Sequence, residues 1–206
     1  MAQKNAVYER PAVVTAEEAK NLLLEGNKRF NTGLPAQKNT GSARRLELKE
    51  KGQKPFAVVL TCSDSRVPPE VLFDQSIGDL FVVRNAGNIL DPVSLGSIEY
   101  AVDHLHTPLV VVLGHDQCGA VKAAVDGGEA PGSIGAIIKK IKPIVEKALA
   151  SGITGDGLYA RVEDENIQSV VAELKESPVI KRFLADGKVT VAGAKYYLGP
   201  GEVKFV

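Results

Sequence analysis

Two cysteines and one histidine follow short apolar runs of the chain, and their side chains are of the kinds that bind zinc. Cys62 follows the apolar run 56–60, and His115 and Cys118 follow the Val-rich run 109–114. Three protein ligands of sulfur and imidazole nitrogen, with a fourth position open, are typical of catalytic zinc sites. If the two runs are neighbouring parallel strands, their ends meet at one edge of a sheet, where ligands of α/β proteins gather. The spacing of three residues between His115 and Cys118 favours side chains on the same side of a turn into a helix.

Other interpretations of the cysteines stay open at this point. A cysteine at a strand end is often a small buried hydrophobe, and this applies to each cysteine taken alone. A redox disulfide between Cys62 and Cys118 is disfavoured by a reducing cytoplasm and by the absence of a Cys-x-x-Cys motif from the sequence. Because both cysteines lie at strand ends, one of them beside a histidine, the pattern favours the metal site.

A carboxylate and a guanidinium, those of Asp64 and Arg66, lie in the loop just beyond Cys62. A neighbouring guanidinium keeps a carboxylate ionised and fixes the direction in which it accepts hydrogen bonds. An ordinary loop salt bridge is the alternative. Next to Cys62, the pair is better interpreted as a group that orients the chemistry at the metal.

Length, charge and composition restrict the class of protein. The 206 residues suit one α/β domain, predicted here to span residues 1–206. Lys+Arg and Asp+Glu both number 25, so no basic footprint for nucleic acid is expected. The sequence has no apolar run of the roughly 18–20 residues that a membrane span needs, and two cysteines do not make a secreted disulfide framework. The N-terminus lacks a signal-peptide core, which predicts a cytoplasmic protein, although a trimmed secretory leader would leave the same sequence.

Strands and helices alternate along most of the chain, which predicts an α/β fold: a mostly parallel central sheet flanked by helices. The expected strands are 56–61, 79–84, 109–114, 188–197 and 202–206. The expected helices are 15–30, 43–51, 68–73, 92–105, 117–125, 133–150, 163–176 and 179–185, with Pro143 kinking or dividing the sixth. A tight turn at 198–201 makes the last strand an antiparallel C-terminal edge strand.

The first 50 residues are expected to form an N-terminal helical arm. Residues 1–14 are polar and irregular, and Thr15 with Glu18 forms a capping-box pattern that starts the first helix. Helices that precede the first strand are expected to have no sheet face of their own to cover. We therefore predict that the arm packs on a partner subunit.

The residues introduced above resemble the two-part zinc signature of β-class carbonic anhydrases. The two parts are Cys62-Ser-Asp64-Ser-Arg66 and Gly114-His115-x-x-Cys118-Gly119. The likeness extends to the segments 26–30, 79–88, 96–100 and 177–180, so it covers the chain from about residue 15 to the end.

The resemblance implies reversible hydration of carbon dioxide to bicarbonate and a proton by attack of zinc-bound hydroxide. It implies Zn²⁺ bound by Cys62, His115 and Cys118, with Asp64 held by Arg66 and accepting a hydrogen bond from the hydroxide. In some relatives the aspartate binds the zinc in a closed, inactive state, so Asp64 is also a conditional ligand. Two thiolates offset the charge of the metal, so activity is expected to favour alkaline pH.

Further expectations follow from the same resemblance. Gln75, Val67 and Gly119 are expected to line the substrate pocket, and a homodimer or higher homo-oligomer is expected because relatives build their sites at a subunit interface. Two alternatives are a hydrolase of carbonyl sulfide or carbon disulfide on the same scaffold, and a non-catalytic zinc-binding module. The hydrolase would differ from a carbonic anhydrase in access to the pocket. The binding module would differ in having Asp64 permanently bound to the metal.

Overall fold

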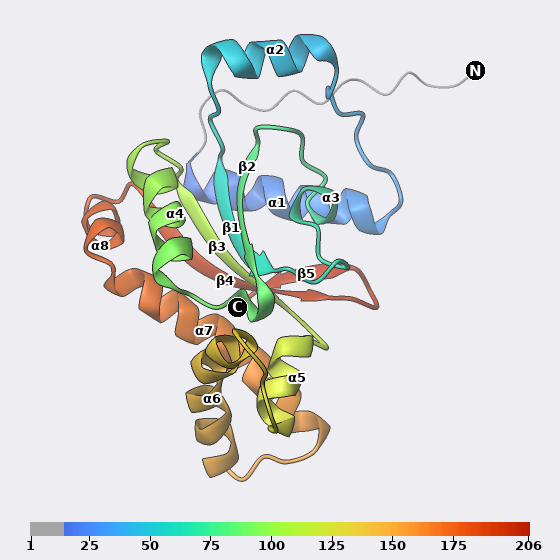
Figure 1. The fold of residues 1–206 in the computed structure, drawn as a ribbon. Helices are drawn as coiled ribbons and strands as arrows, with labels where there is room; N and C mark the ends of the chain where they lie inside the picture. The colour runs from blue at the N-terminus through green and yellow to red at the C-terminus, as the bar shows by residue number, and fades with distance from the viewer. Residues whose placement is uncertain (1–14) are drawn as a thin grey trace.

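A five-stranded sheet forms the centre of the protein, whose computed structural model describes residues 15–206. The strands are β1 (Ala57–Cys62), β2 (Leu80–Asn85), β3 (Leu109–His115), β4 (Thr190–Tyr197) and β5 (Glu202–Phe205). Their order is β2-β1-β3-β4-β5; the first four are parallel and β5 is antiparallel (Figure 1). The predicted fold class is confirmed, whereas the irregular arm predicted for residues 1–14 lies outside the described residues.

Most helices lie where the sequence predicts them. They are α1 (Ala16–Asn31), α2 (Ser42–Lys51), α3 (Pro69–Leu72), α4 (Pro92–Asp103), α5 (Gly119–Asp126), α6 (Ile134–Ala150), α7 (Asp156–Glu176) and α8 (Pro178–Ala185), with a short 3-10 turn, η1 (Ala86–Asn88). Helix α7 begins seven residues earlier than expected, because Leu158 and Val162 already pack in the core and extend its apolar face. Helix α6 is a single element that runs through Pro143.

Both faces of the sheet are covered by helices of the same chain. On one face, Ala19 and Leu23 of α1 pack with alternate residues of β1 and β3, including Val59 and Val111. On the other face, α4, α7 and α8 pack against Val58, Leu60 and their neighbours. The expectation that the first helix has no sheet face to cover is therefore wrong, because α1 packs directly on β1 and β3.

The carboxyl ends of the strands meet a third apolar cluster. Helices α5 and α6 and the first half of α7 form this part, at the end of the molecule opposite α2 (Figure 1). Strands β1 and β3 are direct neighbours and end together, and the buried Thr61 hydroxyl donates to the carbonyl oxygen of Leu113 over 2.8 Å. This contact fixes the two strand ends that carry the predicted metal ligands.

Helix α2 stands apart from the sheet at the other end of the molecule (Figure 1). None of the residues that the structure describes in α2 is buried, and Leu46 is 53% exposed. Packing of the arm on a partner subunit stays a prediction. The surfaces left for such packing are α2 and the side of α1 that faces away from the sheet. Among residues 15–206, no helix is long and apolar enough to cross a membrane.

Candidate metal centre

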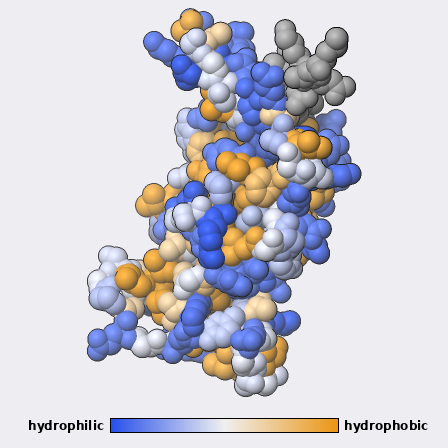
Figure 2. All heavy atoms as spheres, turned by 90° about the vertical axis from the view of Figure 1, so that its right-hand side faces the viewer, coloured by the Kyte–Doolittle hydropathy of each residue, from blue (hydrophilic) through white to orange (hydrophobic). Residues whose placement is uncertain are grey.

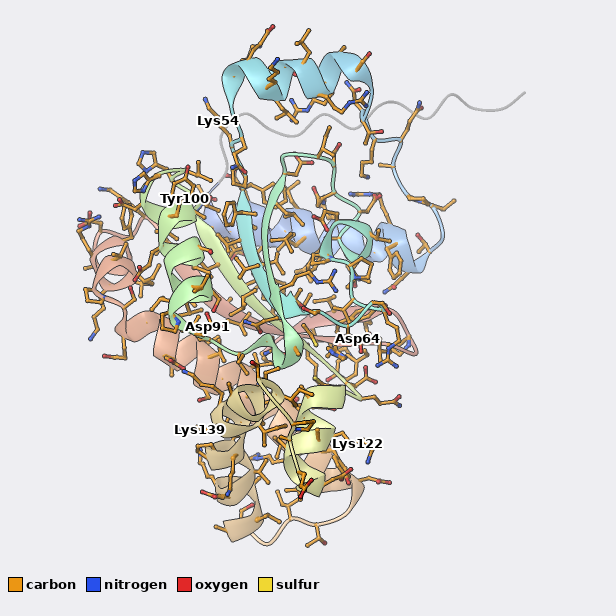
Figure 3. All side chains as sticks on the ribbon, viewed as in Figure 1. Lys54, Asp64, Asp91, Tyr100, Lys122 and Lys139 are labelled. Carbon is orange, nitrogen blue, oxygen red and sulfur yellow. The ribbon has the colours of Figure 1, made fainter. Side chains whose placement is uncertain are left out.

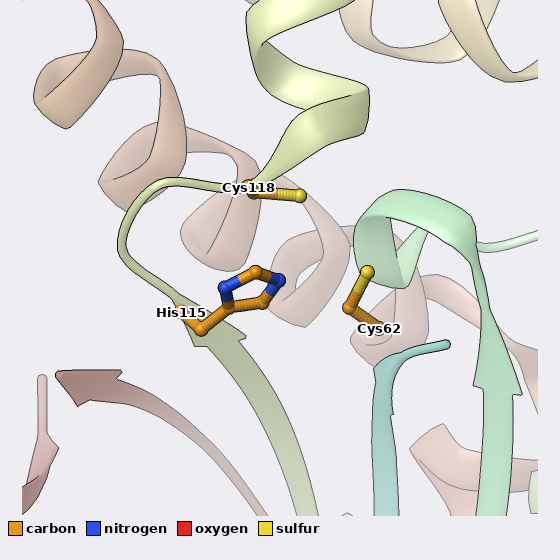
Figure 4. A group of neighbouring side chains, drawn as sticks. All are labelled: Cys62, His115 and Cys118. Atoms are coloured by element: carbon orange, nitrogen blue, oxygen red, sulfur yellow. The ribbon is translucent and has the colours of Figure 1, made fainter. Parts of the chain in front are cut away.

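Three buried side chains that can bind a metal converge beyond the carboxyl end of the sheet. Cys62 is the last residue of β1, His115 is the last residue of β3, and Cys118 is the residue that precedes α5 (Figure 4). One ligand atom of each, two Sγ and one imidazole nitrogen, all lie within 4.8 Å of one another. The predicted ligand set is thus brought together by the structure, and both cysteines are free thiols.

The short segment between His115 and Cys118 brings these two side chains together in a way that sequence spacing did not predict. The two residues do not share a helix, because α5 begins only at Gly119. Instead the chain reverses through Gln117, whose φ of 53° lies in the left-handed region. The turn directs both side chains toward the end of β1, so the expected convergence is confirmed and the expected helical geometry is wrong.

One hydrogen bond determines which nitrogen of His115 is available. Its Nδ1 lies 2.8 Å from the carbonyl oxygen of Asp116, and because a carbonyl only accepts, Nδ1 carries the proton and donates. The Nε2 atom is buried and has no hydrogen-bond partner within the described part of the chain. A buried nitrogen with a free lone pair, on a ring oriented by its other nitrogen, is the usual arrangement of a metal-binding histidine.

The contact between the two thiols shifts their pKa values in opposite directions. A hydrogen bond from Cys118 is the main cause that lowers the pKa of Cys62, and the backbone N–H of Gly87 at 3.3 Å acts in the same direction against burial. The same contact and burial raise the pKa of Cys118. Burial opposes the charged form of His115, but its pKa is raised by the Cys62 thiolate and by the carbonyl of Asp116.

The donor set fits a divalent metal ion, which the structure itself does not contain. Zinc takes cysteine sulfur and histidine nitrogen as ligands, usually in tetrahedral geometry. The Nε2 atom of His115 has no hydrogen-bond partner among the described residues, and two buried sulfur atoms lie beside it. A bound cation would pair with the lone pairs of all three atoms. The residues present therefore fit zinc, with Cys62, His115 and Cys118 as the side chains that would bind it.

Asp64 and Arg66 form a bidentate pair beside the three ligands. The Arg66 Nε and Nη2 atoms donate to Asp64 Oδ1 and Oδ2 over 2.9 and 2.7 Å, and the Arg66 backbone N–H also donates to Oδ1. The Arg66 guanidinium lowers the pKa of Asp64 to about 2. Asp64 lies beyond the end of β1, at the edge of the sheet that faces α5 (Figure 3), and its Oδ2 is 3.9 Å from His115 Nε2.

The three predicted pocket residues are placed differently. Val67 is fully buried in the cluster under α1, and the Nε2 of Gln75 donates to the carbonyl oxygen of Phe73 over 2.6 Å, next to α1. Gly119 is the first residue of α5 and follows Cys118 directly. Val67 and Gln75 therefore lie on the side of the sheet that α1 covers. A role of all three residues in the substrate pocket stays a prediction.

A cavity of about 750 Å³ adjoins the metal-ligand group on the side of α5 and α7. Its lining residues are Asp116, Gln117, Cys118, Lys122, Asp156, Tyr159, Ala160 and Glu163. The cavity gives the Cys118 side of the site a connection to solvent, with charged groups of both signs on its walls.

Several contacts of the site were missed by sequence reasoning. The Arg84 side chain donates to the backbone carbonyls of Cys62 and Asp64 over 3.1 and 2.7 Å. Gly87 presents its N–H to Cys62, and Glu163 accepts from the N–H of Cys118 over 3.3 Å. The position of Arg84 at the end of the neighbouring strand was a usable signal, whereas nothing in the sequence around Glu163 indicates its contact.

Known proteins share the sequence family and the fold of this chain. The family described as carbonic anhydrase matches residues 57–203. A carbonic anhydrase of Mycolicibacterium smegmatis is 43% identical over 88% of this chain and 89% of its own. One of two tetrameric β-carbonic anhydrases of Sordaria macrospora superposes with a TM-score of 0.74 at 26% identity, covering 91% of this chain and 93% of its own. The chain therefore belongs to the β-class of the carbonic anhydrase family.

The bidentate pair generates a prediction about protonation. Because Arg66 is the main cause of the low pKa of Asp64, Arg66→Ala should move that pKa upward from about 2 toward the usual value near about 3.9. Carboxyl ¹³C NMR over an acid pH series measures the shift. The stabilisation from this pair is present above the ordinary aspartate pKa and is lost as pH falls through the lowered one.

The control for that titration is Arg161→Ala, which breaks an ion pair with Glu165 on α7. It should leave the Asp64 resonance unchanged. If the pKa of Asp64 stays at about 2 in Arg66→Ala, the Arg66 guanidinium is not what lowers it.

Proposed function

We propose that the chain binds one Zn²⁺ through Cys62 Sγ, His115 Nε2 and Cys118 Sγ and catalyses the reversible hydration of carbon dioxide to bicarbonate and a proton. The observation that carries the proposal is the convergence of three buried ligand atoms within 4.8 Å, next to a fixed carboxylate. Relatives that are 43% identical over most of the chain are named carbonic anhydrases, which supports the same reaction here.

The metal and the protein contribute different chemistry. Bound zinc supplies a nucleophile at moderate pH, since it lowers the pKa of a water from above about 15 to about 7 when its ligands are neutral. Two thiolates offset the charge of a divalent ion, so the acidifying effect is weaker and activity should rise toward alkaline pH. The side chains of Cys62, His115 and Cys118 are buried, and small molecules would reach them through the cavity that adjoins Cys118.

Asp64 would orient the attacking group. Arg66 holds both of its carboxylate oxygens, so the carboxylate is ionised and its remaining lone pairs have a fixed direction. Oδ2 faces the side of His115 Nε2, where it can accept a hydrogen bond from a proton-bearing nucleophile. By accepting that hydrogen bond, Asp64 would leave a lone pair of the nucleophile free to attack carbon dioxide.

The pairing of Asp64 with Arg66 also supports the active arrangement of the site. To act as a fourth metal ligand, Asp64 would have to release at least one of its two hydrogen bonds to the Arg66 guanidinium. We therefore assign the paired arrangement to the active state, and direct binding of Asp64 to a closed state. The same release would remove the group that orients the nucleophile.

The chain would act as a homo-oligomer in the cytoplasm. Apolar side chains are exposed along residues 24–77, including Leu24, Leu34, Leu46, Val71 and Ile77. Hydrophobic groups lie among hydrophilic ones over the face shown in Figure 2. The Sordaria macrospora enzymes are described as tetrameric, which supports association of this chain with its own copies.

Zinc content tests the ligand assignment. Protein purified without chelators should contain about one zinc per chain by atomic emission. Cys62→Ser should lose most of it, because a serine hydroxyl is a poor zinc ligand in place of a thiolate. Ser63→Ala, a change of the neighbouring residue that leaves all three ligands in place, is the control. Wild-type protein with far less than one zinc per chain would contradict the assignment.

Turnover tests the role of Asp64. In stopped-flow hydration of carbon dioxide, Asp64→Ala should retain zinc but lose about 10²-fold or more of kcat, which is the lower end expected for a lost proton-accepting group. Wild-type activity should rise with pH. Full activity of the Asp64 variant would refute the role.

The same assay separates the proposed reaction from its alternatives. Carbonyl sulfide offered in place of carbon dioxide should be turned over far more slowly. Preference for carbonyl sulfide would indicate the hydrolase, and a zinc-loaded chain without either activity would indicate a binding module.

A further inference from the structure

Helix α7 contacts the backbone segments that carry the metal ligands. It runs past the carboxyl ends of the central strands, between the sheet and the α5–α6 part of the molecule (Figure 1). Glu163 and Asn166 are three residues apart and therefore lie on the same side of this helix. They are 6% and 2% exposed, which is unusual for polar residues in a helix of 21 residues. Neither residue belongs to the ligand set or to the Asp64–Arg66 pair.

Asn166 holds the residue that donates to Cys62. Its Nδ2 donates to the carbonyl oxygen of Gly87 over 2.9 Å, and the N–H of Gly87 donates to Cys62 Sγ over 3.3 Å. Gly87 has a φ of 78°, and a Cβ at this position would come within 3.0 Å of Ala120 and Ile141. A side chain at this position would be strained by the positive φ and by the close neighbours, and the hydrogen bond from Asn166 holds the Gly87 carbonyl in place.

Glu163 holds the backbone of Cys118. Its Oε1 accepts from the N–H of Cys118 over 3.3 Å, and its Oε2 lies 2.9 Å from the Nζ of Lys195. Lys195 on β4 is 3% exposed and also binds Asp164 over 2.7 Å. A buried carboxylate is stable only beside a paired cation, so the ion pair with Lys195 holds the Glu163 side chain in place beneath the start of α5.

The third ligand segment is fixed by packing. Gly114 precedes His115, and a Cβ on Gly114 would come within 2.6 Å of Ile167 of α7. Only a glycine at position 114, next to His115, leaves room for Ile167 of α7 to pack this closely against β3. Residues 163–167 of α7 thus contact the segments of Cys118 and His115 directly and reach Cys62 through Gly87.

We propose that Glu163 and Asn166 are positioning residues that preform the metal centre, acting through the backbones of Cys118 and Gly87. This inference rests on the zinc site proposed above. The ordered outer contacts hold the two sulfur atoms at metal-binding separation before the metal arrives, so less ordering remains when it binds. Lys195 serves the same purpose by keeping Glu163 in place.

The test measures zinc affinity in the full-length chain by competition with a chelator. Asn166→Ala and Glu163→Ala should each weaken zinc binding by about 10- to 100-fold, the range found for outer partners of metal ligands. Glu163→Gln keeps an oxygen acceptor for the Cys118 N–H and should recover part of the loss. Ser169→Ala, on the exposed side of the same helix, should bind zinc like the wild type.

A spectroscopic readout separates positioning from general destabilisation. In cobalt-substituted protein, the sulfur-to-cobalt charge-transfer band should shift or weaken in the Asn166 and Glu163 variants and stay unchanged in Ser169→Ala. Melting temperatures of the zinc-free proteins are recorded alongside. Variants that melt earlier but keep wild-type zinc affinity and an unchanged cobalt band would overturn the inference.

Failure of the zinc site itself gives a different result. If the wild-type chain holds no zinc, the proposed metal centre fails and the positioning role fails with it. If the wild type holds zinc and both alanine variants match it, only the positioning role is wrong. Should an alanine variant fail to fold, Glu163→Gln, which preserves size but removes the charge that pairs with Lys195, should still bind zinc more weakly than the wild type, and wild-type affinity in this variant would overturn the role of Glu163.

Discussion

The shared edge at which β1 and β3 end is the constraint on which the rest of the site depends. Parallel neighbours finish together, so Cys62 and His115 can reach one point only in the observed register, in which Thr61 pairs with Leu113. A shift of one residue would turn Cys62 to the opposite face of the sheet, under α1. The uniformly buried strands and the hydrogen bond of Thr61 to Leu113 make that shift costly.

Two carboxylate–cation pairs with different surroundings serve this edge. Asp64 and Arg66 pair at the border with solvent, where the carboxylate stays ionised and can face a reacting group. Glu163 and Lys195 pair in the interior, where a lone charge would be strongly unfavourable and the pair therefore cannot easily separate. The Asp64–Arg66 pair at the border with solvent is suited to orienting a reacting group. The buried pair is suited to holding backbone in place.

The sequence predicted that Cys62, His115 and Cys118 lie together because they follow local patterns: an apolar strand, then a side chain that can bind zinc at or just beyond its end. It also predicted the Asp64–Arg66 pair, which spans only three residues. It failed where contacts join distant segments, as with Asn166 and Gly87, which are 79 residues apart and have no shared pattern. It also misplaced the role of α1, because the sequence does not state which sheet face a helix that precedes the first strand will cover.

X-ray absorption at the zinc edge of the purified chain counts the donors around the metal and identifies their elements. We expect two sulfur atoms at about 2.3 Å and one imidazole nitrogen at about 2.0–2.1 Å, completed by one light atom. In Asp64→Ala the sulfur count should stay the same. A first coordination sphere with one sulfur or none, or zinc bound outside Cys62 and Cys118, would contradict the account.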